Sequence, residues 1–145
     1  MNEMLNKYAL VLGADTIGQG IAIRFAREGA RLAVLDPDTA TAEELARTIR
    51  ASGGHALAFT APLNETAGAS VKAAIAQLGG LDVLVNNVLP MPAIGPLESQ
   101  SATIFADAFA CIQAAVAAMQ AALPAMQEAG SGRIINIGPL RRGYQ

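Results

Sequence analysis

Residues 8–20 read YALVLGADTIGQG, an apolar run that leads into a turn containing Gly13, Gly18 and Gly20. An uninterrupted apolar run that ends in glycine is typical of a strand buried on both faces of a sheet. Glycines in the turn let the backbone approach a pyrophosphate, and the helix predicted to follow offers it free N–H groups. The stretch therefore predicts the opening strand, turn and helix of a nucleotide-binding α/β unit, although a tight turn alone also explains Gly13 and Gly18.

The pattern of strand and helix repeats along the chain. Strands separated by helical segments of about 10 to 15 residues favour right-handed crossovers and a parallel sheet. We therefore predict an α/β fold, with residues 1–145 forming one domain. The predicted strands are residues 8–12, 31–35, 56–59, 81–85 and 133–137, and the later helices are residues 40–51, 71–78 and 99–129.

The longest predicted helix covers residues 99–129. Its large apolar side chains recur at spacings of three and four, and most other positions are alanine, so we expect one side to pack on the sheet and the other on a helix. Residues 108–127 carry no charge, but three glutamines and Pro124 interrupt them, which predicts a buried helix of a soluble protein rather than a membrane span. The apolar stripe consists of Phe105, Phe109, Ile112, Val116, Met119, Leu123 and Met126.

Composition excludes several classes of function. The chain has 10 Lys and Arg against 12 Asp and Glu, and its basic residues cluster only at Arg141 and Arg142, so we expect neither a nucleic-acid partner nor an anionic membrane. One cysteine and one histidine form neither an intramolecular disulfide nor a metal cluster. Residues 1–7 lack the apolar core of a signal peptide, and we expect a cytoplasmic protein.

Asp36 directly follows the second predicted strand. A carboxylate at this place accepts hydrogen bonds from the hydroxyls of an adenosine ribose and repels a 2'-phosphate. The order of strand, glycine turn, helix, strand and acid therefore predicts a dinucleotide site that favours NAD over NADP.

Several framework segments resemble the short-chain dehydrogenase/reductase family over essentially the whole chain. They are IA at 21–22, RFAREGAR at 24–31, LDVLVNN at 81–87, AALP at 121–124 and GRIINI at 132–137. The resemblance implies a Rossmann-like, doubly wound parallel sheet with strand order 3-2-1-4-5, lacking the family's C-terminal strands and helices. It also implies an NAD(P)-dependent oxidoreductase, whose cofactor contacts would here be Gly13, Ile17, Gly18, Asp36, Leu63, Asn87 and Val88.

The implied cofactor site departs from the family pattern. The turn between Gly13 and Gly18 is one residue shorter than the family's glycine motif and lacks the middle glycine. Pro62, followed by Leu63, replaces an aspartate that meets the adenine in the family. Val88-Leu89 stands where the family has Ala-Gly beside the ribose and nicotinamide. NAD binding is therefore expected to be weak or lost.

The implied catalytic positions depart further. Cys111 occupies the place of the family's active-site asparagine, and Pro139 that of its catalytic serine. Tyr144 comes too early for the family's Tyr-x-x-x-Lys motif and no lysine follows it. We therefore assign no catalytic residue to this chain and predict that it is inactive alone.

Three functional interpretations remain open. We favour a non-catalytic, degenerate subunit that pairs with an intact NAD-dependent dehydrogenase subunit through helix 99–129, because hetero-oligomers with one silent subunit are known in the family. A homo-oligomer is also open. The alternatives are a truncated part of an active NAD-dependent alcohol or ketone oxidoreductase, and a nucleotide-binding module without chemistry.

Overall fold

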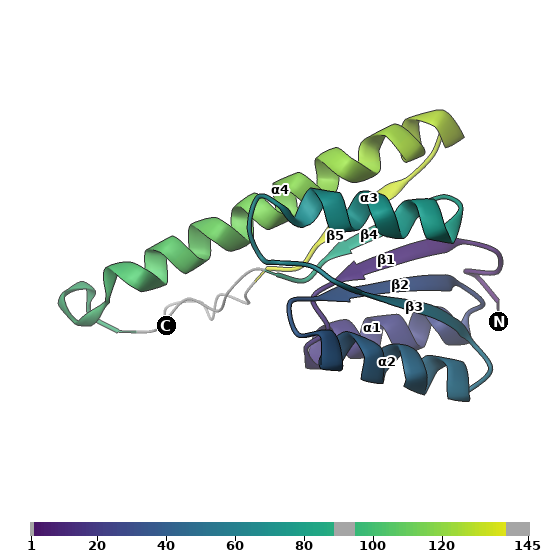
Figure 1. The fold of residues 1–145 in the computed structure, drawn as a ribbon, viewed down its shortest axis with the longest axis horizontal. Coiled ribbons are helices and arrows are strands. Elements are labelled where there is room, and N and C mark those ends of the chain that lie inside the picture. The colour runs from purple at the N-terminus through teal and green to yellow at the C-terminus, as the bar shows by residue number, and fades with distance from the viewer. Residues whose placement is uncertain (1, 89–94, 139–145) are drawn as a thin grey trace, which may run out of the picture.

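The computed structural model describes residues 2–88 and 95–138. Five parallel strands form one sheet in the order β3-β2-β1-β4-β5, with helices on both faces (Figure 1). Both the α/β class and the predicted strand order are confirmed. In chain order the elements are β1 Tyr8–Leu12, α1 Thr16–Arg27, β2 Arg31–Asp36, α2 Thr39–Ala51, β3 His55–Thr60, α3 Ala67–Leu78, β4 Val83–Asn86, the 3-10 helix η1 Leu97–Ser99, α4 Ala102–Ala129 and β5 Arg133–Asn136.

The central strands are buried on both faces, as their apolar runs predict. Leu10 and Leu12 of β1 join a core cluster with α3 and α4, whereas Ala9 and Val11 join a second cluster with α1 and α2. All four side chains are fully buried. Because the strands are parallel and in register, Leu12 pairs with both Leu35 of β2 and Asn86 of β4. The carboxyl ends of β1, β2 and β4 therefore lie side by side.

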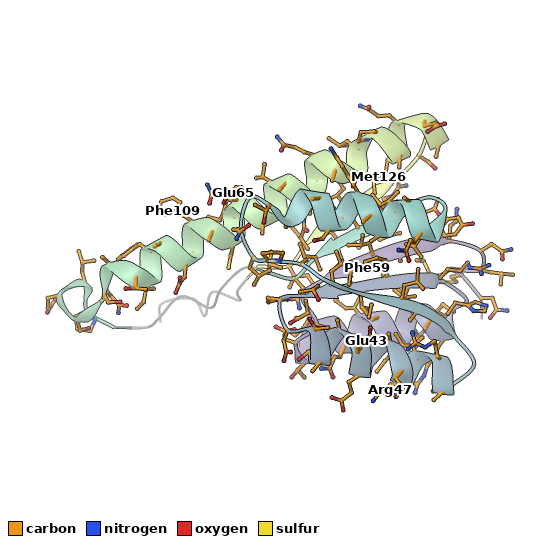
Figure 2. The ribbon with its side chains drawn as sticks, viewed as in Figure 1. Glu43, Arg47, Phe59, Glu65, Phe109 and Met126 are labelled. Carbon is orange, nitrogen blue, oxygen red and sulfur yellow. The ribbon has the colours of Figure 1, made fainter. Side chains whose placement is uncertain are left out.

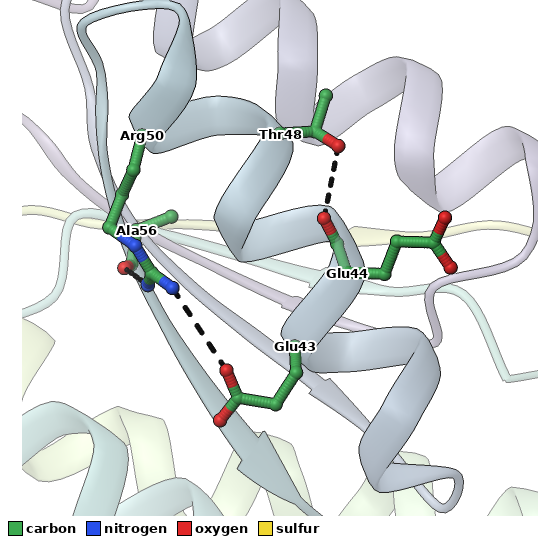
Figure 3. Close-up of polar contacts among 5 residues, drawn as sticks. All are labelled: Glu43, Glu44, Thr48, Arg50 and Ala56. Atoms are coloured by element: carbon green, nitrogen blue, oxygen red, sulfur yellow. Dashed lines mark hydrogen bonds and ion pairs between the residues drawn. The ribbon is translucent and has the colours of Figure 1, made fainter.

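α2 protects one edge of the sheet. β3 is an edge strand, and the Arg50 side chain of α2 donates through Nη1 to the carbonyl oxygen of Ala56 at 2.7 Å (Figure 3). The other guanidinium nitrogen lies 4.0 Å from a Glu43 carboxylate oxygen, and about half of each side chain is exposed, so this ion pair adds little stability. Covering an edge carbonyl in this way hinders pairing with another strand.

α4 packs on α3 and on the sheet, as predicted, but its apolar stripe is mostly exposed. The side chains that it buries against α3 and the sheet are mostly alanines, while Phe109 is 67% exposed and Phe105 49% exposed. The prediction of a buried helix is therefore wrong, because only six of the 28 residues of α4 are buried. Short alanine side chains let α3 approach closely, since a Cβ added at Gly68 of α3 would lie 3.3 Å from the Ala117 carbonyl oxygen.

The ends of α4 have different surroundings. Its N-terminal part projects beyond the sheet and carries Phe109, whereas Met126 is buried near the C-terminal end (Figures 1 and 2). Among the described residues α4 is the one helix with the length and composition to cross a membrane, a criterion that core helices of soluble proteins also meet.

β5 is less covered than its neighbours. Val83 and Val85 of β4 are buried, as predicted, but Ile135 of β5 is 44% exposed. A shallow groove beside it is lined by residues of α1, by Val85 and by Ile135. Ile137 is half-buried against the core cluster on this face. The α1 face of the sheet is thus closed over β4 and open over β5 in the part of the chain that the structure describes.

Candidate functional site

Gly13 marks the centre of the site, at the end of β1. Its N–H donates to the Leu35 carbonyl oxygen at 2.8 Å, and the N–H of Asn87 donates to the Leu12 carbonyl oxygen at 2.8 Å. Gly13 has φ +99°, and a Cβ there would lie 2.1 Å from the backbone oxygen of Asn87. The close passage of the chain after β4 therefore requires glycine at this position.

Gly18 lies in the first turn of α1, against the same segment. A Cβ at Gly18 would lie 1.9 Å from the Gly13 carbonyl oxygen and 2.9 Å from Asn87 Nδ2. At Gly20, by contrast, an added Cβ would have nothing within 4 Å. Packing within the turn thus accounts for Gly13 and Gly18 without a ligand, which is the alternative left open by the sequence.

Asp15 is the N-cap of α1 and organises the turn. Its Oδ1 accepts hydrogen bonds from the backbone N–H of Ile17 and of Gly18, both at 3.0 Å. The same oxygen accepts one from Asn87 Nδ2 at 2.6 Å, and that amide nitrogen also lies 3.2 Å from the Gly13 carbonyl oxygen. One carboxylate therefore joins the start of α1 to the end of β4.

Asp36 ends β2, and its carboxylate binds backbone on both sides. Oδ2 accepts from the N–H of Ala14 at 2.8 Å, and Oδ1 accepts from the N–H of Asp38 at 2.9 Å. The residue is partly exposed, and each carboxylate oxygen keeps a lone pair that these two hydrogen bonds do not use. An aspartate held in this way is preorganised to accept hydrogen bonds from a ligand's hydroxyl groups.

The remaining predicted contacts differ in exposure. Ile17 is 56% exposed, whereas Val88 is 5% exposed and lies beside Gly13, where an added Cβ would be 3.4 Å from Val88 Cγ1. Leu63 is half-buried and packs against the core cluster on the α3 and α4 side. The structure thus brings Gly13, Gly18, Asn87 and Val88 together. Asp36 joins them through Ala14.

Sequence reasoning missed the side chain of Asn86. It is 1% exposed, and its Nδ2 donates to the Ala115 carbonyl oxygen of α4 at 3.3 Å and to Asn136 Oδ1 of β5 at 3.0 Å. Its Oδ1 is buried without a hydrogen-bond partner among the described residues. A polar residue at the end of an apolar strand was the available signal. Asn86 therefore links the end of β4 to α4 and to the end of β5.

The catalytic positions are described only in part. Cys111 lies on α4 and is partly exposed, and burial together with the nearby Asp107 carboxylate raises the pKa of its thiol. A raised pKa keeps the sulfur protonated near neutral pH and disfavours a role as nucleophile. Leu89, Pro139 and Tyr144 lie outside the described residues. The described part of the chain holds no group of three potential metal ligands.

The model of the short chain dehydrogenase family matches residues 7–141. The chain belongs to this family. A hydroxy(phenyl)methylsuccinyl-CoA dehydrogenase subunit of Thauera aromatica, BbsC, is 35% identical over 143 residues, which cover 93% of this chain and 55% of that protein. A 1,6-dihydroxycyclohexa-2,4-diene-1-carboxylate dehydrogenase of Acinetobacter baylyi is 42% identical over 86 residues, covering 57% of this chain and 33% of that protein.

Solved structures agree with the family assignment. A metagenomic short-chain oxidoreductase in complex with NADP superposes with a TM-score of 0.87 at 31% identity, over 99% of this chain and 67% of that one. NAD+-bound xylitol dehydrogenase gives a TM-score of 0.85 at 28% identity, over 92% of this chain and 53% of that one. Nicotinamide dinucleotides thus bind within the family. This chain spans about half to two thirds of the length of these structures.

A nicotinamide dinucleotide fits this site only in part. Asp36 has the position and free lone pairs that suit a ribose. The start of α1 does not suit the phosphates, because the Asp15 carboxylate already takes the N–H groups of Ile17 and Gly18 and adds a negative charge there.

Proposed function

We propose that this short chain dehydrogenase relative is a non-catalytic subunit that binds an intact dehydrogenase subunit through α4. The observation that carries the proposal is the apolar stripe on the outer side of that helix. Its exposed members are Phe105 at 49%, Phe109 at 67%, Ile112 at 48%, Val116 at 42% and Leu123 at 42%.

The stripe is large and continuous. The spacing of its members places them along one side of α4, opposite the buried alanines. Large contiguous apolar patches on soluble proteins mark surfaces that bind a partner or a membrane. A second helix of similar pattern covers such a stripe well, because large side chains from two helices interlock in each other's grooves. We expect a homologous subunit to supply a helix of this kind.

The local chemistry supports a silent role. Hydride transfer to a carbonyl needs a proton donor near the substrate oxygen. Cys111 lies at the place of the family's asparagine, and its raised thiol pKa makes it a weak proton donor. The sequence has no histidine near it. Pro139, at the place of the serine, has no hydroxyl group to offer. The Asp15 carboxylate occupies N–H groups that would bind the cofactor phosphates, so we expect NAD binding too weak to support catalysis.

One relative supports the proposal that this chain is a subunit of a larger enzyme. The Thauera protein is named as a subunit of a dehydrogenase, and this chain matches it over 93% of its own length. A second candidate, a nucleotide-binding module without chemistry, is favoured by Asp36. Its carboxylate is fixed by two backbone N–H groups where a ribose would lie.

Co-expression tests the proposal. An intact short chain dehydrogenase from the same genome is expressed with this chain, which carries an affinity tag, and the purified material is analysed for a complex of fixed stoichiometry. We expect such a complex with the wild type and its loss in Ile112→Asp. Ala73→Asp, at an exposed position of α3, is the matched control and should retain it. Absence of any complex with each intact homologue would refute the pairing.

A further inference from the structure

We propose that the Asp15 carboxylate is an internal anion that fills the phosphate-binding donors of the β1–α1 turn and thereby excludes dinucleotides. The inference rests on the proposed function, because it names the residue responsible for weak NAD binding. It predicts that a neutral residue at position 15 creates tighter binding of phosphate-bearing nucleotides.

Four N–H groups of the turn already have acceptors within the chain. The N–H groups of Ile17 and Gly18 both donate to Asp15 Oδ1. The N–H of Gly13 donates to Leu35, and that of Ala14 donates to Asp36. A phosphate that binds any of these four N–H groups must therefore displace an existing acceptor, so its net gain there is small.

Asn87 strengthens the occlusion. Its amide Nδ2 lies 2.6 Å from Asp15 Oδ1, a third donor to the same oxygen, and also lies near the Gly13 carbonyl oxygen. Three donors on one oxygen hold the carboxylate over the first turn of α1. A charged hydrogen bond is stronger than a neutral one, so the carboxylate is a strong competitor for these donors. Its negative charge also repels a phosphate.

α2 offers a matched comparison. Asp38 caps α2 in the same manner, since its carboxylate accepts from the N–H of Ala40 at 3.0 Å and from Thr41 Oγ1 at 2.9 Å. Both aspartates therefore stabilise a helix start. Only Asp15 also contacts the segment after β4, at the glycine turn. Comparing variants of Asp15 with variants of Asp38 therefore separates the general effect of losing a helix cap from a local effect on nucleotide binding.

The test measures binding to the 145-residue chain by calorimetric titration. The variants are Asp15→Asn, which keeps the shape of the side chain and removes its charge, and Asp15→Gly, which removes both the charge and the acceptor at a position where glycine is a tolerated cap. Asp38→Asn is the control. The probes are NADH, which carries a pyrophosphate, and adenosine, which carries none. Thermal unfolding of each variant confirms that it is folded.

We expect at least tenfold tighter NADH binding in both Asp15 variants, with adenosine binding unchanged and Asp38→Asn like the wild type. The inference is overturned if NADH binding is unchanged in both Asp15 variants. It is also overturned if adenosine or Asp38→Asn shows the same gain, or if the wild type binds NADH more tightly than about 10 micromolar. Pairing through α4 is measured separately by sedimentation, so either idea can fail alone.

Discussion

Replacing Gly18 with alanine should destabilise the protein, although alanine is the better helix former. The new Cβ would lie 1.9 Å from the Gly13 carbonyl oxygen and 2.9 Å from Asn87 Nδ2. The nearer contact is with backbone, which cannot rotate away as a side chain can. The β1–α1 turn must therefore shift, and with it the hydrogen bonds of Asp15 and Asn87.

The magnitude follows from two opposing terms. Overpacking costs about 3 kcal/mol at the upper end of its usual range, and the gain in helix propensity returns about 1 kcal/mol, so we expect a net loss of about 2 kcal/mol. Gly20→Ala is the control on the same helix: an added Cβ there has nothing within 4 Å, so this variant should gain about 1 kcal/mol. The two variants should thus differ by about 3 kcal/mol.

Urea unfolding followed by circular dichroism measures the difference. With an m-value of about 2 kcal/mol per molar, the two midpoints should lie about 1.5 M apart, with Gly18→Ala the lower. Equal midpoints, or a Gly18→Ala variant more stable than the wild type, would refute the described packing of the turn.

Two further predictions concern the polar groups around the site. Asp36→Ala removes the acceptor for the N–H groups of Ala14 and Asp38, so it should lower the free energy of unfolding by about 1 to 2 kcal/mol and weaken any NADH binding. The wild type should bind NADPH less tightly than NADH. Urea unfolding and calorimetric titration measure these effects, and unchanged values would contradict the assigned role of Asp36. Burial and the Asp107 carboxylate raise the thiol pKa of Cys111, so iodoacetamide should alkylate this thiol more slowly at pH 8 than it alkylates free cysteine. The reaction should be faster in Asp107→Asn than in the wild type. Equal rates in the wild type and in Asp107→Asn would show that the carboxylate has no influence.

Much of the fold follows from local patterns in the sequence. The first strand was predicted at its observed bounds, because an apolar run that ends at Gly13 allows few alternatives. α3 begins at Ala67, before the predicted residue 71, because its first turn is made of small residues without a clear apolar period. α4 begins at Ala102 rather than at residue 99, since a separate 3-10 helix precedes it.

The packing of α4 could not be read from hydrophobicity alone. Its large side chains form a helical stripe that normally marks the core-facing side, yet the structure buries residues such as Ala114, Ala118 and Ala122 instead. Close approach to α3 depends on small side chains in both helices, and that is a property of the pair. The composition of one helix does not reveal it.

The polar contacts of the site depend on distant parts of the chain. A capping role for Asp15 is visible locally, because it directly precedes a helix. Its hydrogen bond to Asn87 joins residues 72 positions apart and exists only because β4 pairs with β1. The occupied state of the turn therefore emerged from the three-dimensional structure, although Ile17, Gly18 and Asn87, which donate to Asp15, were already candidates.

Sedimentation velocity at micromolar concentration tests the central claim, assembly through the outer stripe of α4, most directly. Two samples are compared, the wild-type chain alone and the wild-type chain mixed with an intact homologue. In at least one of them the chain should sediment as part of a dimer or larger species. Ile112→Asp should sediment as a folded 14.9 kDa monomer, because it places a charge in the middle of the stripe. A wild-type chain that remains a stable, non-aggregating monomer in both samples would contradict the account.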